Sequence, residues 1–230
     1  MARANGVSLP RGVLAGLTAD LNLIATAPHL LPGWLRMPQG HRVVGPVYAR
    51  LPGELPEFLA DLAAGPQPLV YFAMGSSGNR DLVLNVLAGL GRAECQVLAP
   101  VRSHLRQEDL ETLPRNVHVT AWLPAHQLGD AVDLAITHGG EGTVQTSCVQ
   151  GWPFIGIPLQ FEQRFNVQRC VAFGSARLVS QREARRADWA ELVRQALADD
   201  GMRSRARRMA GLMEGLDGPG RAAEAICELL

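Results

Sequence analysis

The chain has 230 residues, of which 22 are basic and 22 are acidic, so its formal net charge is zero. This balance excludes a chain-wide basic surface for nucleic acid or for an anionic membrane. No apolar run is long enough to span a bilayer, and the first residues lack the apolar stretch of a signal peptide. We therefore expect a cytoplasmic protein that binds no nucleic acid and does not insert into a membrane.

The segment 1–66 is interrupted throughout by proline and glycine. An apolar piece at 19–27 could form a strand, although no neighbouring segment is an evident partner for it. The stretch ELPEFLADLAA (54–64) predicts a short helix. We expect 1–66 to be the remnant of an N-terminal domain followed by a linker.

From residue 67 onward, apolar runs alternate with helical patterns. A continuous apolar run is typical of a buried parallel strand, and such runs occur at 68–75, 95–100, 116–124, 132–138, 152–158 and 176–180. Helices are predicted at 80–91, 141–150, 160–173, 184–199, 201–214 and 219–230. This alternation predicts an α/β fold over 67–230, in which a Rossmann-like, doubly wound parallel sheet is followed by C-terminal helices.

Four cysteines, Cys95, Cys148, Cys170 and Cys227, are far apart in the chain and form no CxxC pair. Such spacing is not typical of a metal site or of a disulfide framework. We expect reduced thiols, no metal and no cofactor.

Two strand-to-helix junctions have the composition of anion-binding sites. In GSSGN (75–79), Ser76 offers a hydroxyl and an amide at a helix start, and in HGGEGT (138–143) the amides of Gly142 and Thr143 would point from a helix N-terminus at a phosphate. Both junctions would lie at the carboxyl edge of the sheet, where ligands bind. Neither is a GxGxxG fingerprint or a P-loop, and either could be only a turn.

Other side chains fall on the same edge. His138 could hydrogen-bond a phosphate oxygen or be a core histidine. Trp122, which we expect at the end of a strand, could stack on a base while the Leu123 backbone bonds the edge of that base. Glu162 and Gln163 open a helix and could bind sugar hydroxyls, or the acid could simply favour the helix dipole.

Together these segments resemble the GT-B UDP-glycosyltransferases, which include plant natural-product, animal glucuronosyl- and antibiotic-tailoring transferases. The resemblance is carried by WLPAHQL (122–128) and THGGEGTVQTSCVQGWPFIGIPLQFEQ (137–163), which match the family's W-x-P, H-x-G-x-x-[ST], G-x-P and [DE]-Q motifs in register. VYFAMGS (70–76) resembles the first strand of the family's donor domain, and Asn166 matches an asparagine common after the [DE]-Q pair.

The resemblance implies the donor-binding half of a GT-B fold, with a dTDP-sugar or UDP-sugar as substrate and no metal. The implied reaction is an inverting hexosyl transfer to a hydroxyl group of a small-molecule acceptor. The implied contacts are Trp122 and Leu123 with the base, Ser76, His138, Gly140, Gly142 and Thr143 with the diphosphate, and Glu162 and Gln163 with the sugar.

Two positions depart from the family pattern. Ala125 replaces the glutamine after W-x-P, and Thr146 replaces the glutamate expected three residues after Thr143. In the family's UDP-sugar users both side chains tend to contact the ribose, so their joint loss leads to the hypothesis of a dTDP-sugar donor, which lacks the 2′-hydroxyl. Gln127 or Gln145 could replace these contacts.

The family's acceptor-binding domain, which usually supplies a catalytic histidine, has no room in this chain. The segment 20–48 resembles only the closing strand and linker of that domain, and neither His29 nor His41 is expected to be the base. We expect no catalytic residue here, donor binding without transfer, and an acceptor bound through a missing N-terminal domain or a partner chain. One face of the last helix would then be exposed.

Other interpretations remain open. The chain could be a non-catalytic nucleotide-sugar-binding subunit or one half of a two-chain glycosyltransferase. An epimerase or hydrolase of the same architecture would need an acid–base pair, and none is evident. A nicotinamide oxidoreductase is disfavoured by the missing fingerprint and by Ala99-Pro100, where an acid is expected after the second strand.

Overall fold

A computed structural model describes residues 19–229, apart from 49 and 51. Contacts divide the chain into two units: unit 1 takes in the chain up to Val47 together with the segment from Gly215 onward, and unit 2 is Tyr48–Glu214. The division into 1–66 and 67–230 stays a prediction. By contacts, the linker groups with unit 2 and the last helix with unit 1.

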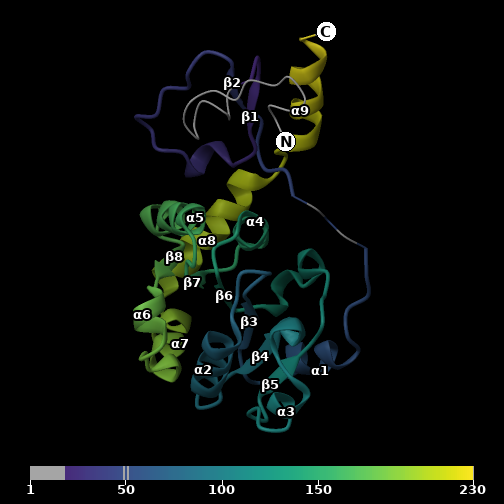
Figure 1. Cartoon of the computed structure of the whole chain (residues 1–230), viewed down its shortest axis with the longest axis vertical. Helices are drawn as coiled ribbons and strands as arrows, with labels where there is room; N and C mark the ends of the chain where they lie inside the picture. The colour runs from purple at the N-terminus through teal and green to yellow at the C-terminus, as the bar shows by residue number, and fades with distance from the viewer. Residues whose placement is uncertain (1–18, 49, 51, 230) are drawn as a thin grey trace, which may run out of the picture. The chain divides into compact units, whose positions relative to one another are not determined.

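Unit 2 is built around one six-stranded sheet (Figure 1). Its strand order is β5-β4-β3-β6-β7-β8, and all neighbouring strands are parallel. The predicted doubly wound parallel sheet is therefore confirmed. The strands are β3 (Leu69–Ala73), β4 (Gln96–Ala99), β5 (Val117–Val119), β6 (Leu134–Thr137), β7 (Phe154–Gly156) and β8 (Ala176–Leu178).

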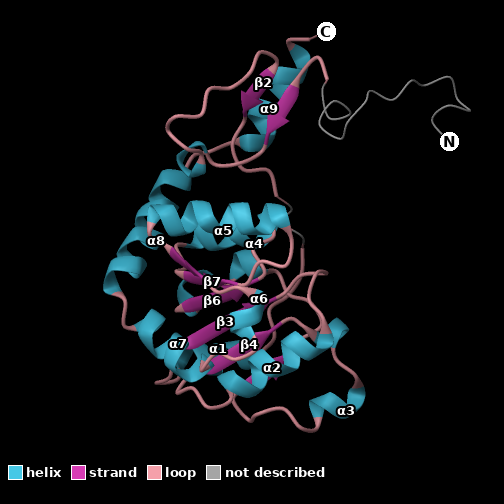
Figure 2. Ribbon diagram, turned by 60° about the vertical axis from the view of Figure 1, so that its left-hand side comes forward, coloured by secondary structure: helices cyan, strands magenta, loops and turns pink. Residues whose placement is uncertain are grey.

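Helices cover both faces of this sheet (Figure 2). Helix α2 packs with α7 on one face, and α4 packs with α5 and α8 on the other. The helices of unit 2 are α1 (Phe58–Ala64), α2 (Arg80–Leu90), α3 (Gln107–Leu110), α4 (Glu141–Gln150), α5 (Phe161–Phe173), α6 (Gln181–Ala184), α7 (Trp189–Leu197) and α8 (Asp200–Met213). Short 3-10 turns are η4 (Arg102–His104), η5 (Ala125–Gln127) and η6 (Gly129–Ala131).

The apolar runs of the sequence form the core. All residues of β3 and β6 are buried, as expected for parallel strands covered on both faces. Phe72 of β3 and Trp189 of α7 belong to the buried cluster that also includes α2. Glycine at position 89 of α2 lets the Trp189 ring pack closely against that helix, since a Cβ there would lie 2.8 Å from Cδ1 of Trp189. The packed core gives the carboxyl edge of the sheet a rigid base.

The strand order reverses between β3 and β6. From β3 the chain moves outward to β4 and β5, and then returns to β6 on the other side of β3. The connections after β3 and β6 therefore diverge, which opens a crevice at their carboxyl ends. Since Ala73 pairs with Thr137 in this register, the two predicted anion junctions come side by side.

Two predicted elements of unit 2 are wrong in detail. Strand β5 ends at Val119, so Trp122 lies in the following loop, where Pro124 offers no backbone donor to extend the ladder. The helix predicted at 184–199 begins later and is shorter, since α7 runs from Trp189 to Leu197 and Ala184 ends the separate short helix α6. The carboxylate of Asp188 begins α7 by accepting from the N–H of Glu191 at 3.4 Å.

Unit 1 contains a two-stranded parallel sheet, β1 (Asn22–Ile24) with β2 (His41–Val43), together with α9 (Gly218–Cys227) and the 3-10 turn η3 (Pro28–Leu30). The strand predicted within 19–27 is confirmed, but the expectation that it lacks an evident partner is wrong. The partner β2 is only three residues long, too short for a periodic pattern to stand out. Ile226 of α9 is 51% exposed, in line with the expected open face.

Across the described ranges, every helix is too short or too polar to cross a membrane.

Candidate functional site

The crevice between β3 and β6 is lined by the ring of His138 and by two glycines. A Cβ added to Gly75 would lie 2.6 Å from Cε1 of His138, and one added to Gly140 would lie 2.9 Å from the same atom. Gly75 also has a φ of +52°, which favours glycine. The imidazole can therefore lie between two backbone segments, and the structure brings together His138, Gly140 and the turn that contains Ser76.

His138 is buried, and its Nδ1 atom is enclosed without a hydrogen-bond partner among the described residues. Burial lowers the pKa of His138, with a smaller contribution from His104, whereas the Ala73 carbonyl and the Glu162 carboxylate act in the opposite direction. A buried imidazole nitrogen without a partner is unusual in a purely structural role. This favours a ligand-binding histidine over a core histidine.

Helix α4 begins without a cap. Gly140 is the N-cap and has no side chain, and the N–H groups of Glu141, Gly142 and Thr143 have no partner within the described part of the chain. The Thr143 hydroxyl donates to the Gly140 carbonyl at 2.9 Å and accepts from the Thr137 hydroxyl at 2.8 Å, which holds the turn without using those N–H groups. Free N–H groups at the positive end of a helix dipole are suited to bind an anion.

The space in front of α4 is open. A Cβ added to Gly142 would meet no atom within 4 Å, and Ser76 across the crevice is exposed. The acid at this turn, Glu141, is exposed, and its carboxylate accepts from the Gln145 amide at 2.6 Å. The carboxylate thus bonds along its own helix, as an anion-binding role for α4 requires.

Helix α5 begins differently. The side-chain oxygen of Gln163 accepts from the N–H groups of Leu159 and Gln160 at 2.9 and 3.1 Å, and its side-chain NH₂ group donates to the Ser77 hydroxyl at 3.1 Å. Gln163 is 2% exposed, whereas Glu162 is exposed. In this arrangement Gln163 ties α5 to the Gly75–Gly78 turn, and Glu162 is the member of the pair that is free to meet a sugar.

Trp122 lies on the loop after β5 and is 52% exposed, unlike the buried Trp152 and Trp189. This loop continues into η5, which contacts α4, and the Gln150 amide donates to the His126 carbonyl at 2.7 Å. The loop after Trp122 therefore reaches α4, and this hydrogen bond lies at Gln150, the end of the helix opposite to Gly140. The N–H of Leu123 has no partner among the described residues, as a base-edge contact would need.

The two positions that depart from the family pattern lie on these same elements. Ala125 is in η5, and the Thr146 hydroxyl on α4 donates to the Gly142 carbonyl at 2.8 Å. Of the two alternative ribose partners, Gln145 is completely buried and therefore cannot reach a ribose. Gln127 is exposed, and its amide donates to the Gly53 carbonyl at 3.3 Å.

Sequence reasoning missed two residues at this rim. His104 follows β4 and lies within 2.7 Å of the Gly75 carbonyl, and its place after a strand is a signal that could have been used. Gly53 lies in the linker, and a Cβ there would be 2.8 Å from Cζ3 of Trp122. No local pattern reveals the second contact, because it joins segments far apart in the sequence.

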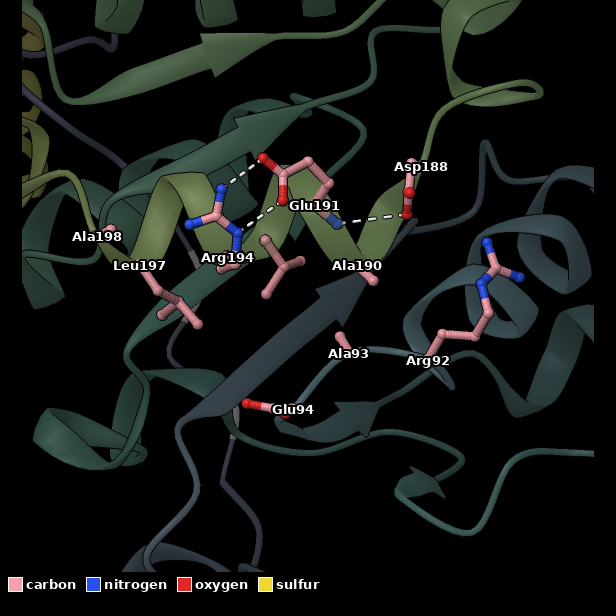
Figure 3. A pocket seen from close by; sticks show the side chains of 10 residues that line it. Arg92, Ala93, Glu94, Asp188, Ala190, Glu191, Arg194, Leu197 and Ala198 are labelled. Atoms are coloured by element: carbon pink, nitrogen blue, oxygen red, sulfur yellow. Dashed lines mark hydrogen bonds and ion pairs between the residues drawn. The ribbon is translucent and has the colours of Figure 1, made fainter.

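A separate hollow of about 570 Å³ lies beside α7 (Figure 3). Residues 92–94, which precede β4, form its other wall, so it opens toward the amino ends of the strands. Hydrogen bonds from Arg194 and then Gln195 lower the pKa of Glu191 to about 2, so this carboxylate is paired on its own helix. The hollow contains none of the predicted site residues. Among the described residues, no group of three or more His, Cys, Asp or Glu could hold a metal ion.

At the switch point of the sheet the structure therefore brings together backbone N–H groups without partners in the described chain and a buried imidazole whose Nδ1 has none, and Trp122 lies exposed on the loop after β5. The fold is that of the C-terminal half of a GT-B glycosyltransferase. Residues 84–229 match the family described as Erythromycin biosynthesis protein CIII-like, C-terminal domain. The chain belongs to this family.

Individual relatives agree with this assignment. The chain is 29% identical over 193 residues to the PGL/p-HBAD biosynthesis glycosyltransferase of Mycobacterium tuberculosis, covering 83% of this chain and 44% of the relative. It is 30% identical over 202 residues to 4'-demethylrebeccamycin synthase of Lentzea aerocolonigenes, covering 84% and 46%. The chain thus spans less than half the length of these relatives.

The solved structure of the glycosyltransferase VinC in complex with dTDP has the same fold. The TM-score is 0.71 at 18% identity, over 90% of this chain and 51% of VinC.

Proposed function

We propose that this chain is the donor-binding half of an inverting glycosyltransferase that transfers a hexosyl group from a nucleoside diphosphate to a hydroxyl group of a small-molecule acceptor. The observation that carries the proposal is the uncapped start of α4 beside His138, at the switch point of the sheet. Three N–H groups without partners in the described chain and an adjacent imidazole suit a diphosphate better than any neutral ligand.

The diphosphate is also the leaving group of the reaction. As the bond to the sugar breaks, negative charge grows on the diphosphate oxygens. The N–H groups of Gly142 and Thr143, the Ser76 amide and His138 would already point at these oxygens, so they would stabilise that charge without rearranging. Gly140 permits the close approach of His138 and the helix start.

The remaining proposed contacts are with the base and with the sugar of the donor. Trp122 would stack on the pyrimidine and Leu123 would bond the edge of the base. Glu162 would accept hydrogen bonds from sugar hydroxyls, while Gln163 would support the sugar from within the protein and directly contact it only after releasing Ser77.

We favour a dTDP-sugar over a UDP-sugar. Ala125 offers no polar group to a ribose, the Thr146 hydroxyl bonds its own helix, and Gln145 is buried. A deoxyribose lacks the 2′-hydroxyl that these positions leave without a partner. The binding of dTDP by VinC is a property of that protein and agrees with this preference.

The catalytic base and the acceptor pocket would come from a second, acceptor-binding domain or from a partner chain. Two observations support this. The relatives are more than twice as long as the matched segment. The described residues of unit 1 form a parallel sheet of two strands, whereas parallel sheets are normally larger and covered on both faces. A non-catalytic binding subunit is the alternative role for the same site.

The experiment is calorimetric titration of this chain with dTDP, UDP, GDP and NAD in parallel. We expect dTDP to bind, UDP to bind about 10-fold more weakly because one hydroxyl is left unsatisfied, and GDP and NAD not to bind. Trp122→Ala should weaken dTDP binding by about 10-fold or more, since base stacking contributes about 1–3 kcal/mol. Equal or tighter binding of UDP would overturn the dTDP preference, and absence of any diphosphate binding would overturn the donor site.

A further inference from the structure

His104 lies against the turn that joins β3 to α2. Its Nε2 atom is 2.7 Å from the Gly75 carbonyl oxygen, and a Cβ on Gly78 would lie 3.2 Å from the same nitrogen. A carbonyl only accepts hydrogen bonds, so Nε2 carries the proton and donates. Gly75 is thus held on two sides, with His104 at its carbonyl and the His138 ring at its Cα.

This hydrogen bond sets the direction of a second group. The Gly75 carbonyl and the Ser76 N–H belong to one planar trans peptide, so they point in opposite directions. The Ser76 N–H has no partner among the described residues. Holding the carbonyl toward His104 therefore aims a free donor away from His104.

Without His104, the Gly75 carbonyl would have no hydrogen-bond partner among the described residues. Turning this peptide changes ψ of Gly75 and φ of Ser76, and glycine, at one end of it, has no Cβ to oppose the rotation. A flipped peptide would direct the Gly75 carbonyl into the space now faced by the Ser76 N–H. An N–H group that can donate a hydrogen bond to an anion would then be replaced by a carbonyl oxygen, whose partial negative charge repels the anion.

The position of His104 is itself fixed. Asp109, a buried carboxylate on the same segment, accepts from Nε and Nη2 of Arg80 at 2.9 and 2.5 Å and from the Arg106 N–H at 2.7 Å. Arg80 is the first residue of α2, which follows the Gly75–Gly78 turn. The ion pair thus locks the segment that bears His104 to the helix that bears the turn.

We propose that His104 is a positioning residue, which holds the Gly75–Ser76 peptide so that the Ser76 N–H points at the donor diphosphate. This inference rests on the proposed function, because it requires the diphosphate to lie between the Gly75–Gly78 turn and α4. His104 acts through the peptide and does not touch the substrate.

The test compares His104→Gln with His104→Met, two side chains of similar size of which only glutamine can donate to the carbonyl. Each variant is titrated with dTDP and with thymidine, which lacks the diphosphate, and its folding is checked by urea unfolding. We expect His104→Met to weaken dTDP binding by about 10-fold, the effect of one charge-assisted hydrogen bond. Thymidine binding should stay within about twofold, and His104→Gln should restore most of the dTDP affinity.

Two results would overturn the inference. One is an unchanged dTDP affinity in His104→Met, and the other is an equal loss for dTDP and thymidine, which would show a general effect on the fold. His29→Ala, an exposed histidine of unit 1, serves as the control for loss of an imidazole. Failure of the proposed function is distinguishable, because the unmodified chain would then bind dTDP no more tightly than thymidine.

Discussion

Helices α4 and α5 begin after neighbouring strands at the same edge of the sheet, yet their first turns differ. At α4 the N-cap is Gly140, and three N–H groups remain free within the described chain. At α5 the side chain of Gln163 reaches back to the N–H groups of Leu159 and Gln160. The N-cap and first turn of α4 therefore have no side chain bonded to their N–H groups, whereas at α5 the Gln163 side chain bonds the N–H of the N-cap Gln160 and Glu162 is exposed.

The difference shows where a ligand replaces a cap. A capping side chain and an anion compete for the same N–H groups at a helix start. Helix α2, also on this rim, is capped by Asn79, whose oxygen accepts from the Leu82 N–H at 3.0 Å. Of the three helices that follow β3, β6 and β7, α4 is the one at which no side chain of the described residues accepts from an N–H group of the N-cap or first turn.

The largest expected effect comes from filling the space in front of α4. Gly142→Val places a branched side chain where no atom lies within 4 Å of the added Cβ, so the fold has room for it. Valine also has a slightly better helix propensity than glycine, so the free energy of unfolding should stay equal or rise by about 0.3 kcal/mol. The diphosphate would be displaced from at least two charge-assisted hydrogen bonds, and dTDP affinity should fall by more than about 100-fold.

Gly211→Ala is the matched control for this prediction. Gly211 lies in α8, and its added Cβ also meets no atom within 4 Å. We expect this variant to raise the free energy of unfolding by about 0.5–1 kcal/mol and to leave dTDP binding unchanged. If Gly142→Val binds dTDP as well as the unmodified chain does, the anion does not lie at α4.

At α5, the corresponding change should affect stability. Gln163→Leu keeps the size of a buried side chain but leaves the Leu159 and Gln160 N–H groups and the Ser77 hydroxyl without their partner. The free energy of unfolding should fall by about 1–3 kcal/mol, measured by urea denaturation. A loss below about 0.5 kcal/mol would mean that Gln163 does not hold the two segments together.

Glu162→Gln separates the sugar contact from this structural role. Glu162 is exposed, so the free energy of unfolding should change by less than about 0.5 kcal/mol. Affinity for dTDP should remain within about twofold, while affinity for a dTDP-hexose should fall by about 10-fold, because a charged acceptor is lost. Calorimetry with both ligands decides the matter, and an equal loss for the two would place Glu162 at the nucleotide instead of the sugar.

The sequence predicts the part of the rim that is local. The apolar run at 132–138, the glycines after it and the helix at 141–150 lie close together in the chain, and α4 has the predicted bounds. Patterns of this kind depend on a few successive residues, so strand, turn and helix can be assigned without knowledge of the rest of the fold.

What the sequence does not predict is set by contacts between distant segments. Trp122 was expected at the end of a strand because VHVTAWL is apolar, but the pairing of β5 with β4 stops at Val119. The buried Gln163 donates a hydrogen bond to Ser77, 86 residues earlier. The proposed role of His104 depends on its hydrogen bond to the Gly75 carbonyl, 29 residues earlier. Predicting any of these three features requires the order of the strands in the sheet, which a local sequence pattern does not contain.

The smallest expected effect concerns pH and the burial of His138. Its pKa is lowered in the folded state, mainly by burial, so the unfolded chain takes up a proton first as the pH falls below about 6.5. His138 therefore lowers the free energy of unfolding progressively below that pH and contributes no such penalty above it. His138→Gln should show a smaller loss of stability between pH 7.5 and 5.5, measured by urea unfolding at the two pH values.

His118 provides the comparison for this last prediction, because burial lowers its pKa as well and it lies on β5, away from the cradle. His118→Gln should also reduce the loss of stability at low pH, but it should leave dTDP affinity unchanged, whereas His138→Gln should weaken dTDP binding by about 10-fold. A pH dependence of stability that is the same in His138→Gln as in the unmodified chain would mean that the imidazole is solvated, and that the crevice is more open than the contacts with Gly75 and Gly140 imply.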